Sequence, residues 1–138
     1  MSDPAREALD RLEIHELRGA YSRAIDYENY ERAHDIFTED ALVKYRAGDR
    51  HGAQEVYEYW RDNVEYEFSL HTVQMPEIEL DGDEATGKWY MLVFYVAPDG
   101  SEGHVMGWYE DEYRRVDGEW KISAMDMGIE HDTAGYHV

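Results

Sequence analysis

The sequence contains no cysteine and only 3 prolines among its 138 residues. The absence of cysteine excludes a disulfide framework, a thiolate nucleophile and a zinc site with thiolate ligands. No apolar run approaches the roughly 20 residues that a membrane-spanning helix needs, and the first residues show no apolar segment typical of a secretory signal. We therefore expect a cytoplasmic protein that does not bind membranes.

Basic residues are also scarce, because 13 Lys and Arg stand against 32 Asp and Glu, giving a formal net charge of −19. Nucleic-acid binding requires a basic surface that displaces counterions, so this balance argues against a nucleic-acid partner. Anionic membrane surfaces would repel the chain for the same reason. A content of 43% hydrophobic and 14% aromatic residues argues against disorder. The length favours a single domain over residues 1–138.

The first half of the chain shows the periodicity of helices. Apolar residues recur at helical spacing over residues 4–27, where Asp3 can cap the helix and Pro4 fits its first turn. The pattern also predicts a short helix over residues 29–37 and a helix over residues 53–64. A short strand is expected at residues 41–45, followed by glycine-containing turns.

The second half predicts strands, over residues 71–80, 85–96, 102–116 and 119–129. Asp-Gly pairs between these segments are typical of hairpin turns. The segment over residues 85–96 is apolar on both faces, so we expect both faces to be covered. Helices followed by a strand meander indicate an α+β fold.

Two segments match known functional motifs only in part, and we reject both matches. The segment over residues 82–88 has the spacing of a phosphate-binding loop, but Trp89 replaces the Ser or Thr that would hold magnesium. Asp83 and Glu84 would repel phosphate, and a hairpin turn explains the segment better. His15 lacks the second histidine of a metalloprotease motif, and the 7 histidines form no ligand cluster. We predict neither a metal site nor a cofactor.

Asp26 and His71 are candidates for proton transfer. Asp26 lies near the end of the first predicted helix, where the helix macrodipole disfavours an anion. A histidine held by a carboxylate can act as a general base near neutral pH, although each residue also fits a purely structural role. Tyr21 lies five residues before Asp26, roughly 140° around a helix, so the two meet one pocket only at the helix end.

From about Leu12 to Ile129 the sequence resembles the SnoaL-like branch of the nuclear-transport-factor-2-like superfamily. The block at residues 113–122 is common across the superfamily and indicates the fold, whereas the pair Asp26 and His71 is more specific. The resemblance implies a cone-shaped, curved mixed β-sheet wrapped by three N-terminal helices and enclosing an apolar pocket. The other matching segments are residues 16–21, 37–41, 76–78 and 85–90.

The most similar members are scytalone dehydratase and the bile-acid 7α-dehydratase-like proteins, with hexachlorocyclohexane dehydrochlorinase beside them. The resemblance implies a dyad in which Asp26 holds His71 as the base, while Tyr45 and Tyr21 point into the pocket. It predicts a cofactor-independent, dehydratase-like lyase acting on a small, cyclic, hydrophobic molecule. The expected substrate-binding residues are Trp60, Val93, Tyr95, Gly107, Tyr109 and Met125.

Several pocket residues of these enzymes are not retained. A second pocket histidine falls near Tyr95, and a serine and an asparagine fall near Gly107 and Tyr109. An additional aspartate falls near Val93, and an arginine near Met125. The base is therefore kept while the substrate-specific partners differ. A non-catalytic small-molecule-binding domain, an isomerase or polyketide cyclase of the ketosteroid-isomerase type, and a structural module remain alternatives.

The outward face of the strand meander suggests self-association. Strand alternation places His104 with Met106 and Trp108, opposite the pocket-facing residues, in a structural or interfacial position. One face of the segment 85–96 also needs cover from outside the pocket. We therefore expect a homo-oligomer, with a trimer preferred to a dimer. The residues of that face are Tyr90, Leu92, Phe94 and Val96.

Overall fold

The structure, a computed structural model, describes residues 3–133 and contains helices that precede most of the strands. Asp3 caps the first helix by accepting a hydrogen bond from the backbone N–H of Ala5 at 3.0 Å, as the sequence predicted. The helices are α1 (Pro4–Asp26), the 3₁₀ helix η1 (Tyr30–Arg32), α2 (Ala33–Ile36) and α3 (Gly52–Asn63). The strands are β1 (Phe37–Tyr45), β2 (Gly48–His51), β3 (Phe68–Asp81), β4 (Glu84–Val96), β5 (Glu102–Val116) and β6 (Glu119–Asp132).

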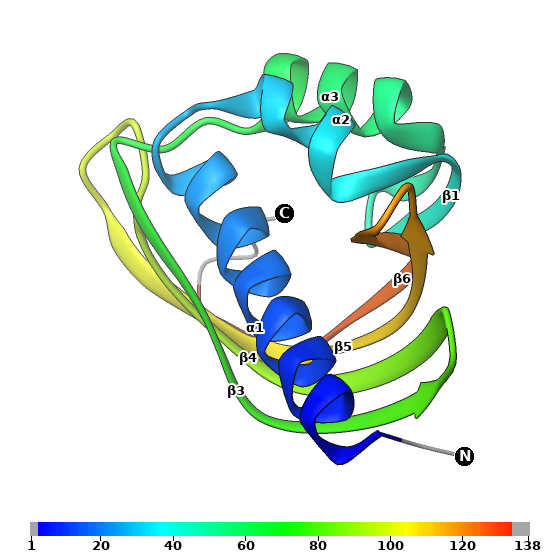
Figure 1. Cartoon of the computed structure of the whole chain (residues 1–138). Helices are drawn as coiled ribbons and strands as arrows, with labels where there is room; N and C mark the ends of the chain where they lie inside the picture. The colour runs from blue at the N-terminus through cyan, green and yellow to red at the C-terminus, as the bar shows by residue number, and fades with distance from the viewer. Residues whose placement is uncertain (1–2, 134–138) are drawn as a thin grey trace.

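The strands form one mixed sheet in the order β2-β1-β6-β5-β4-β3. Every neighbouring pair is antiparallel except β1 and β6, which are parallel. The sheet curves without closing, α1 crosses its concave side, and α2 and α3 cover one end (Figure 1). The expected α+β cone of a curved mixed sheet wrapped by three helices is confirmed.

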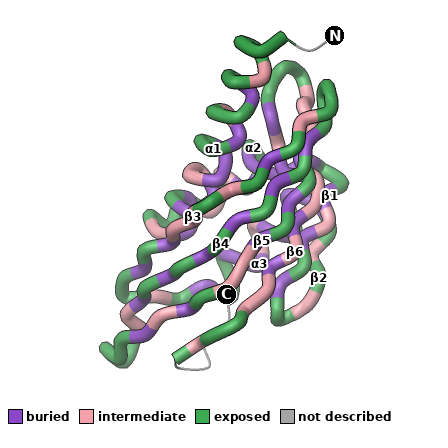
Figure 2. The backbone as a smooth tube through the Cα atoms, turned by 90° about the horizontal axis from the view of Figure 1, so that it is seen from below, coloured by how far each residue is buried: buried purple, intermediate pink, exposed green. Residues whose placement is uncertain are grey.

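Side chains alternate strictly along β4, which Figure 2 shows as alternating buried and exposed segments. The inward residues include Trp89, Val93 and Tyr95, all at most 3% exposed. On the outward face, Tyr90 is 64% exposed and Leu92 is 39% exposed. The outward face of β4 is therefore not covered by the described part of this chain, although its apolar composition predicted a cover.

The start of α1 is fastened to two hairpin turns by Asp10. Its buried carboxylate accepts hydrogen bonds from Arg115 Nη1 at 2.8 Å and from Trp120 Nε1 at 3.1 Å. Arg115 Nε also donates to Asp83 Oδ1 at 2.9 Å, in the β3–β4 turn. Hydrogen bonding to Arg115 holds the pKa of Asp10 below its ordinary value of 3.8.

The structure departs from the predicted elements mainly around β1. That strand begins at Phe37 rather than at residue 41, because its first residue pairs in parallel with Ile122, far away in sequence. The segment Gly48–His51 forms the short strand β2 of a hairpin with β1, where only turns were expected. Strand β3 likewise starts at Phe68, three residues before the predicted start, since it pairs with Val96 at the end of β4.

We predict that Asp10→Asn lowers the free energy of unfolding at pH 7 by about 1.5–3 kcal/mol, the typical worth of hydrogen bonds to a charged group. Because the pKa of Asp10 is lowered by folding, its contribution is complete above pH 3.8 and is lost as the pH falls through the folded-state value. Urea unfolding at several pH values measures this. Asp62→Asn is the matched control, since that carboxylate is exposed and forms an ion pair with the similarly exposed Arg61, and it should change nothing measurable.

Candidate functional site

Asp26, the last residue of α1, is hydrogen-bonded to β3. Its Oδ1 lies 2.6 Å from His71 Nδ1 and accepts from Ser69 Oγ at 2.8 Å, while its Oδ2 accepts from the backbone N–H of His71 at 2.9 Å. These donors offset the unfavourable position of a carboxylate at the C-terminal end of a helix. The same carboxylate requires Nδ1 to carry a proton, so the neutral ring presents Nε2 as an acceptor.

The other ring nitrogen, His71 Nε2, is buried and has no hydrogen-bond partner within the described residues. The side chain of His71 is 3% exposed, and the edge of the Tyr66 ring packs against it at a centroid distance of 5.9 Å. Buried polar atoms without a partner are uncommon in native proteins and call for an explanation. A basic nitrogen held ready for a substrate proton is one such explanation.

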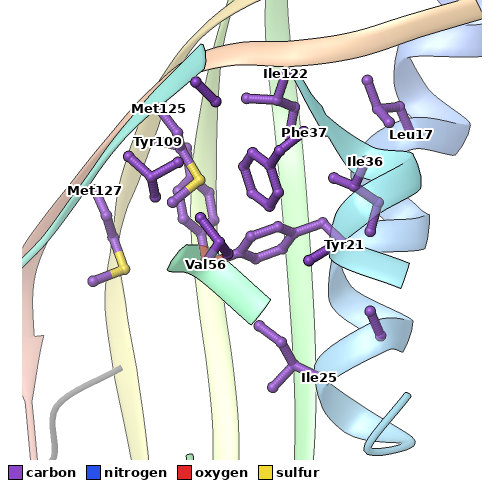
Figure 3. Packing of buried hydrophobic residues seen from close by; sticks show 14 of the residues in the cluster. Leu17, Tyr21, Ile25, Ile36, Phe37, Val56, Tyr109, Ile122, Met125 and Met127 are labelled. Carbon is purple, nitrogen blue, oxygen red and sulfur yellow. The ribbon is translucent and has the colours of Figure 1, made fainter. Parts of the chain in front are cut away.

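A second cluster of polar groups lies between α1, β1 and α3. The hydroxyls of Tyr21 and Tyr45 are 2.8 Å apart, and Trp60 Nε1 donates to the Tyr45 hydroxyl at 2.9 Å. Figure 3 shows the Tyr21 ring reaching from α1 toward Val56 and Tyr109. Burial raises the pKa of both Tyr21 and Tyr45 above 10, so these hydroxyls stay protonated at neutral pH and can donate hydrogen bonds.

Tyr109 on β5 lies beside this tyrosine cluster. Burial raises the pKa of its hydroxyl, while the charge of Arg18 and a hydrogen bond with Tyr21 lower it, and the charge of Asp26 is close enough to raise it. The Tyr109 and Tyr21 rings pack edge to face at 5.7 Å. Tyr109 and Tyr21 therefore belong to one buried group of aromatic rings on the inner side of the fold.

The structure places the remaining predicted site residues on the inner side of the fold. Trp60, Val93, Tyr95 and Met125 are at most 1% exposed within the core. Gly107 differs, because a Cβ atom there would collide with the backbone carbonyl of Gly128, next to a register shift between β5 and β6. The bare backbone of Gly107 is thus required for strand pairing, whatever it does for a ligand.

The interior beside His71 is closely filled by side chains. Five of the surface cavities formed by the described residues have volumes of about 380–630 Å³, and none of these five is lined by Asp26 or His71. The largest of them lies on the outward face beside Met75, Tyr90 and Trp108. Because His71 Nε2 is itself buried, a substrate can reach it only if a neighbouring side chain moves, and the Tyr66 ring is one that packs against His71.

Several residues of the site were not singled out from the sequence. Ser69 could have been found, because it lies two residues before His71 and a strand repeats its faces every two residues. Arg18 could have been found in the same way, since it precedes Tyr21 by three residues on one helical face. Tyr66 lies in the connection between α3 and β3, where no periodicity points to its position.

The outward residue His104 lies with its neighbours opposite the site, as strand alternation predicted. Its ring stacks on that of His131 at 5.4 Å, and it pairs in register with Phe94. Between residues 3 and 133, no group of three or more His, Asp or Glu side chains is arranged to hold a metal ion. None of the helices in that range is long and apolar enough to cross a membrane.

Comparison with known proteins places this geometry in a family context. The model of a SnoaL-like domain matches residues 6–126. An uncharacterized protein of Mycobacterium tuberculosis strain H37Rv is 32% identical over 123 residues, which cover 84% of this chain and 82% of the relative. A protein of identical alignment statistics occurs in Mycobacterium bovis.

Solved structures of similar fold include two with named chemistry. A type 2 hexachlorocyclohexane dehydrochlorinase (LinA) superposes with a TM-score of 0.88 at 20% identity, covering 99% of this chain and 97% of the other. A candidate scytalone dehydratase from Novosphingobium aromaticivorans superposes with a TM-score of 0.87 at 21% identity, covering 96% and 91%. At these identities the likeness shows the fold alone.

We predict that nitrogen NMR of the neutral His71 ring shows a proton on Nδ1 and a free lone pair on Nε2, because Asp26 accepts from Nδ1. Asp26→Asn should populate the other tautomer, since an amide can present either an oxygen or an N–H to the ring. The exposed His51 serves as an internal control whose tautomer should not change. A wild-type His71 protonated on Nε2 would contradict the assignment.

Proposed function

The chain belongs to the SnoaL-like domain family, and on this basis we propose that it is a cofactor-independent lyase in which His71 removes a proton from carbon. The observation that carries the proposal is the buried His71 ring, oriented by Asp26 at 2.6 Å, with Nε2 left without a partner. A base in such a site is poised for proton abstraction, because its tautomer is fixed and water is excluded.

The reaction that fits these groups is the loss of water from a β-hydroxy carbonyl compound, in which the hydroxyl is on the carbon next to the one that loses its proton. His71 Nε2 takes the proton next to the carbonyl, and the electron pair forms the new double bond as the carbon–oxygen bond breaks. A tyrosine of the cluster, Tyr21 or Tyr45, gives its proton to the departing hydroxide, which leaves as water. The proton on His71 then returns to the tyrosinate, restoring both groups.

The surroundings favour a small, cyclic, largely apolar substrate. The side chains around the cluster are aromatic or aliphatic, and they include Phe37, Val56 and Met125 (Figure 3). The net charge of −19 disfavours anionic ligands over neutral ones. The dehydrochlorinase and the candidate dehydratase of similar fold carry names of elimination enzymes, which supports the same class of chemistry here.

A second candidate is a non-catalytic binding domain for a small hydrophobic molecule. The filled interior favours it, because His71 Nε2 has no open path in this structure. Isomerisation or cyclisation of a ketone would use the same base as dehydration. Dehydration, isomerisation and cyclisation are distinguished by their products and not by the residues they require, since each begins with loss of a proton to His71.

We predict that His71→Gln lowers kcat for dehydration by about 10²–10⁴-fold, the usual contribution of a general base. A panel of cyclic β-hydroxy ketones, followed by the absorbance of the conjugated enone and by mass spectrometry, measures this. His51→Gln changes an exposed histidine outside the site and should retain full activity. Turnover that survives His71→Gln would refute the base, whereas ligand binding by the wild type with no turnover would support the binding domain.

We further propose that the protein is a homo-oligomer, with a trimer preferred to a dimer. The outward face of the sheet carries an apolar patch, called the outer-face patch below. Because this patch is largely uncharged on a chain of net charge −19, self-association there avoids like-charge repulsion. The patch is built from Phe68, Leu70, Leu92, Phe94 and Met106, each 39–51% exposed.

We predict that Leu92→Glu dissociates the oligomer, because it places a carboxylate within the outer-face patch. Light scattering coupled to size-exclusion chromatography measures the mass of the wild type and the variant. Leu12→Glu is the matched control, since Leu12 is 61% exposed on α1, away from the patch. A monomeric wild type, or an oligomer that persists in Leu92→Glu, would refute the assignment of this interface.

A further inference from the structure

A buried cation lies directly beside the tyrosine cluster. Arg18 on α1 is fully buried and forms a two-pronged ion pair with Asp111 on β5, with Nε to Oδ2 at 2.8 Å and Nη2 to Oδ1 at 2.7 Å. The Tyr113 hydroxyl donates to Asp111 at 2.5 Å and accepts from Trp89 Nε1 at 2.8 Å. Burial opposes the charge on Arg18, but the attraction of Asp111 outweighs it and raises the pKa of the guanidinium, which stays charged.

Stability alone does not account for this pair. Buried ion pairs can often be replaced by apolar residues of similar volume without loss of stability, because removing two charges from water is costly. Arg18 also keeps one buried nitrogen, Nη1, without a hydrogen-bond partner among the described residues. An unpaired buried donor is unfavourable, so a guanidinium with a spare N–H is a poor choice for a purely structural position.

The position of the guanidinium indicates why an arginine is buried here. Its central carbon, Cζ, lies 3.8 Å from the centroid of the Tyr109 ring and 4.6 Å from that of the Tyr21 ring. Arg18 and Tyr21 share a face of α1, since they are three residues apart. One cation thus packs on two aromatic rings that also contact each other edge to face, at a centroid distance of 5.7 Å.

The charge acts on the oxygens of these rings. Burial raises the pKa of Tyr21 and of Tyr109, and the positive charge of Arg18 opposes that increase in both. A cation fixed in a region of low dielectric stabilises negative charge more strongly than it would in water. Negative charge develops in the proposed reaction on a tyrosine oxygen, or on a substrate oxygen that accepts a hydrogen bond from it.

We propose that Arg18 is a positioning residue that holds the rings of Tyr21 and Tyr109 and supports negative charge on the oxygens at their ends, with Asp111 fixing and partly neutralising the cation. The proposal rests on the proposed function in one respect, namely that substrate binds at these hydroxyls. It predicts that the ligands bound most tightly are phenols and enols in their anionic form, even though the protein as a whole is strongly acidic.

The decisive variants alter the charge with little change in volume. Arg18→Met/Asp111→Leu removes both charges and leaves apolar side chains, while Tyr113 keeps its bond from Trp89. Asp111→Asn is the opposite change, because it retains the cation of Arg18 and removes its counter-charge. Arg18→Lys keeps a cation without the two-pronged geometry. A merely structural role of Arg18 does not predict opposite effects for the first two variants.

The probe is 4-nitrophenol, whose phenolate absorbs visible light whereas its neutral form does not, so absorbance reports the ionised fraction of the bound ligand. We expect Arg18→Met/Asp111→Leu to shift the ionisation equilibrium of the bound phenol about tenfold toward the neutral form, and Asp111→Asn to shift it toward the phenolate. Arg18→Lys should lie between the wild type and the double variant. Tyr21→Phe should weaken binding, which places the probe at the tyrosine cluster.

An ionised fraction that stays within twofold of the wild type in both charge variants would overturn the proposal, as would shifts of the same sign. Failure of the wild type to bind the phenol would also count against it, because a cation-supported donor cluster should bind a phenolate. If the double variant does not fold, the Asp111→Asn shift decides. The measurement needs no turnover, so repeating it in His71→Gln separates a failure of the lyase proposal from a failure of this one.

Discussion

The hydrogen bonds of Asp26 are the constraint on which the site depends, because they join the end of α1 to the start of β3. The helix end and the strand start are 45 residues apart in sequence, and directional hydrogen bonds fix their approach more closely than non-directional apolar packing could. The carboxylate accepts from Ser69, from the His71 ring and from the backbone of His71. One side chain therefore fixes the approach of two elements and the tautomer of a histidine.

The interior of the cone serves both as the hydrophobic core and as the place of a hydrogen-bonded polar cluster. Its aromatic rings form the hydrophobic core, and the polar ends of the same rings form a hydrogen-bonded cluster through Tyr21, Tyr45 and Trp60. An aromatic side chain suits both functions, since most of its surface is apolar and only its tip needs a partner. The same arrangement leaves little free space, so ligand entry is coupled to the movement of a side chain.

The buried carboxylates of the core are each held by a guanidinium group or by hydrogen-bond donors, whereas other carboxylates lie at the surface. Asp10 and Asp111 are buried against the guanidinium groups of Arg115 and Arg18, and Asp26 is shielded by donors from β3. Exposed carboxylates such as Asp62 and Asp83 form the strongly acidic exterior. The net charge of −19 is thus largely a property of the surface, whereas the field at the tyrosine cluster depends on a few buried groups, namely Arg18, its partner Asp111 and Asp26.

The sequence by itself determined the α+β class, the long helix capped by Asp3, the limits of β5 and the alternation along β4, because these follow from local periodicity and turn residues. The resemblance to a family also singled out Asp26 and His71 as a pair. Only the tertiary structure decided the early start of β1, the backbone requirement at Gly107 and the burial of Arg18 against Asp111. Each of these depends on an element distant in sequence, and a local pattern of residues carries no information about which distant backbone or charge will lie against it.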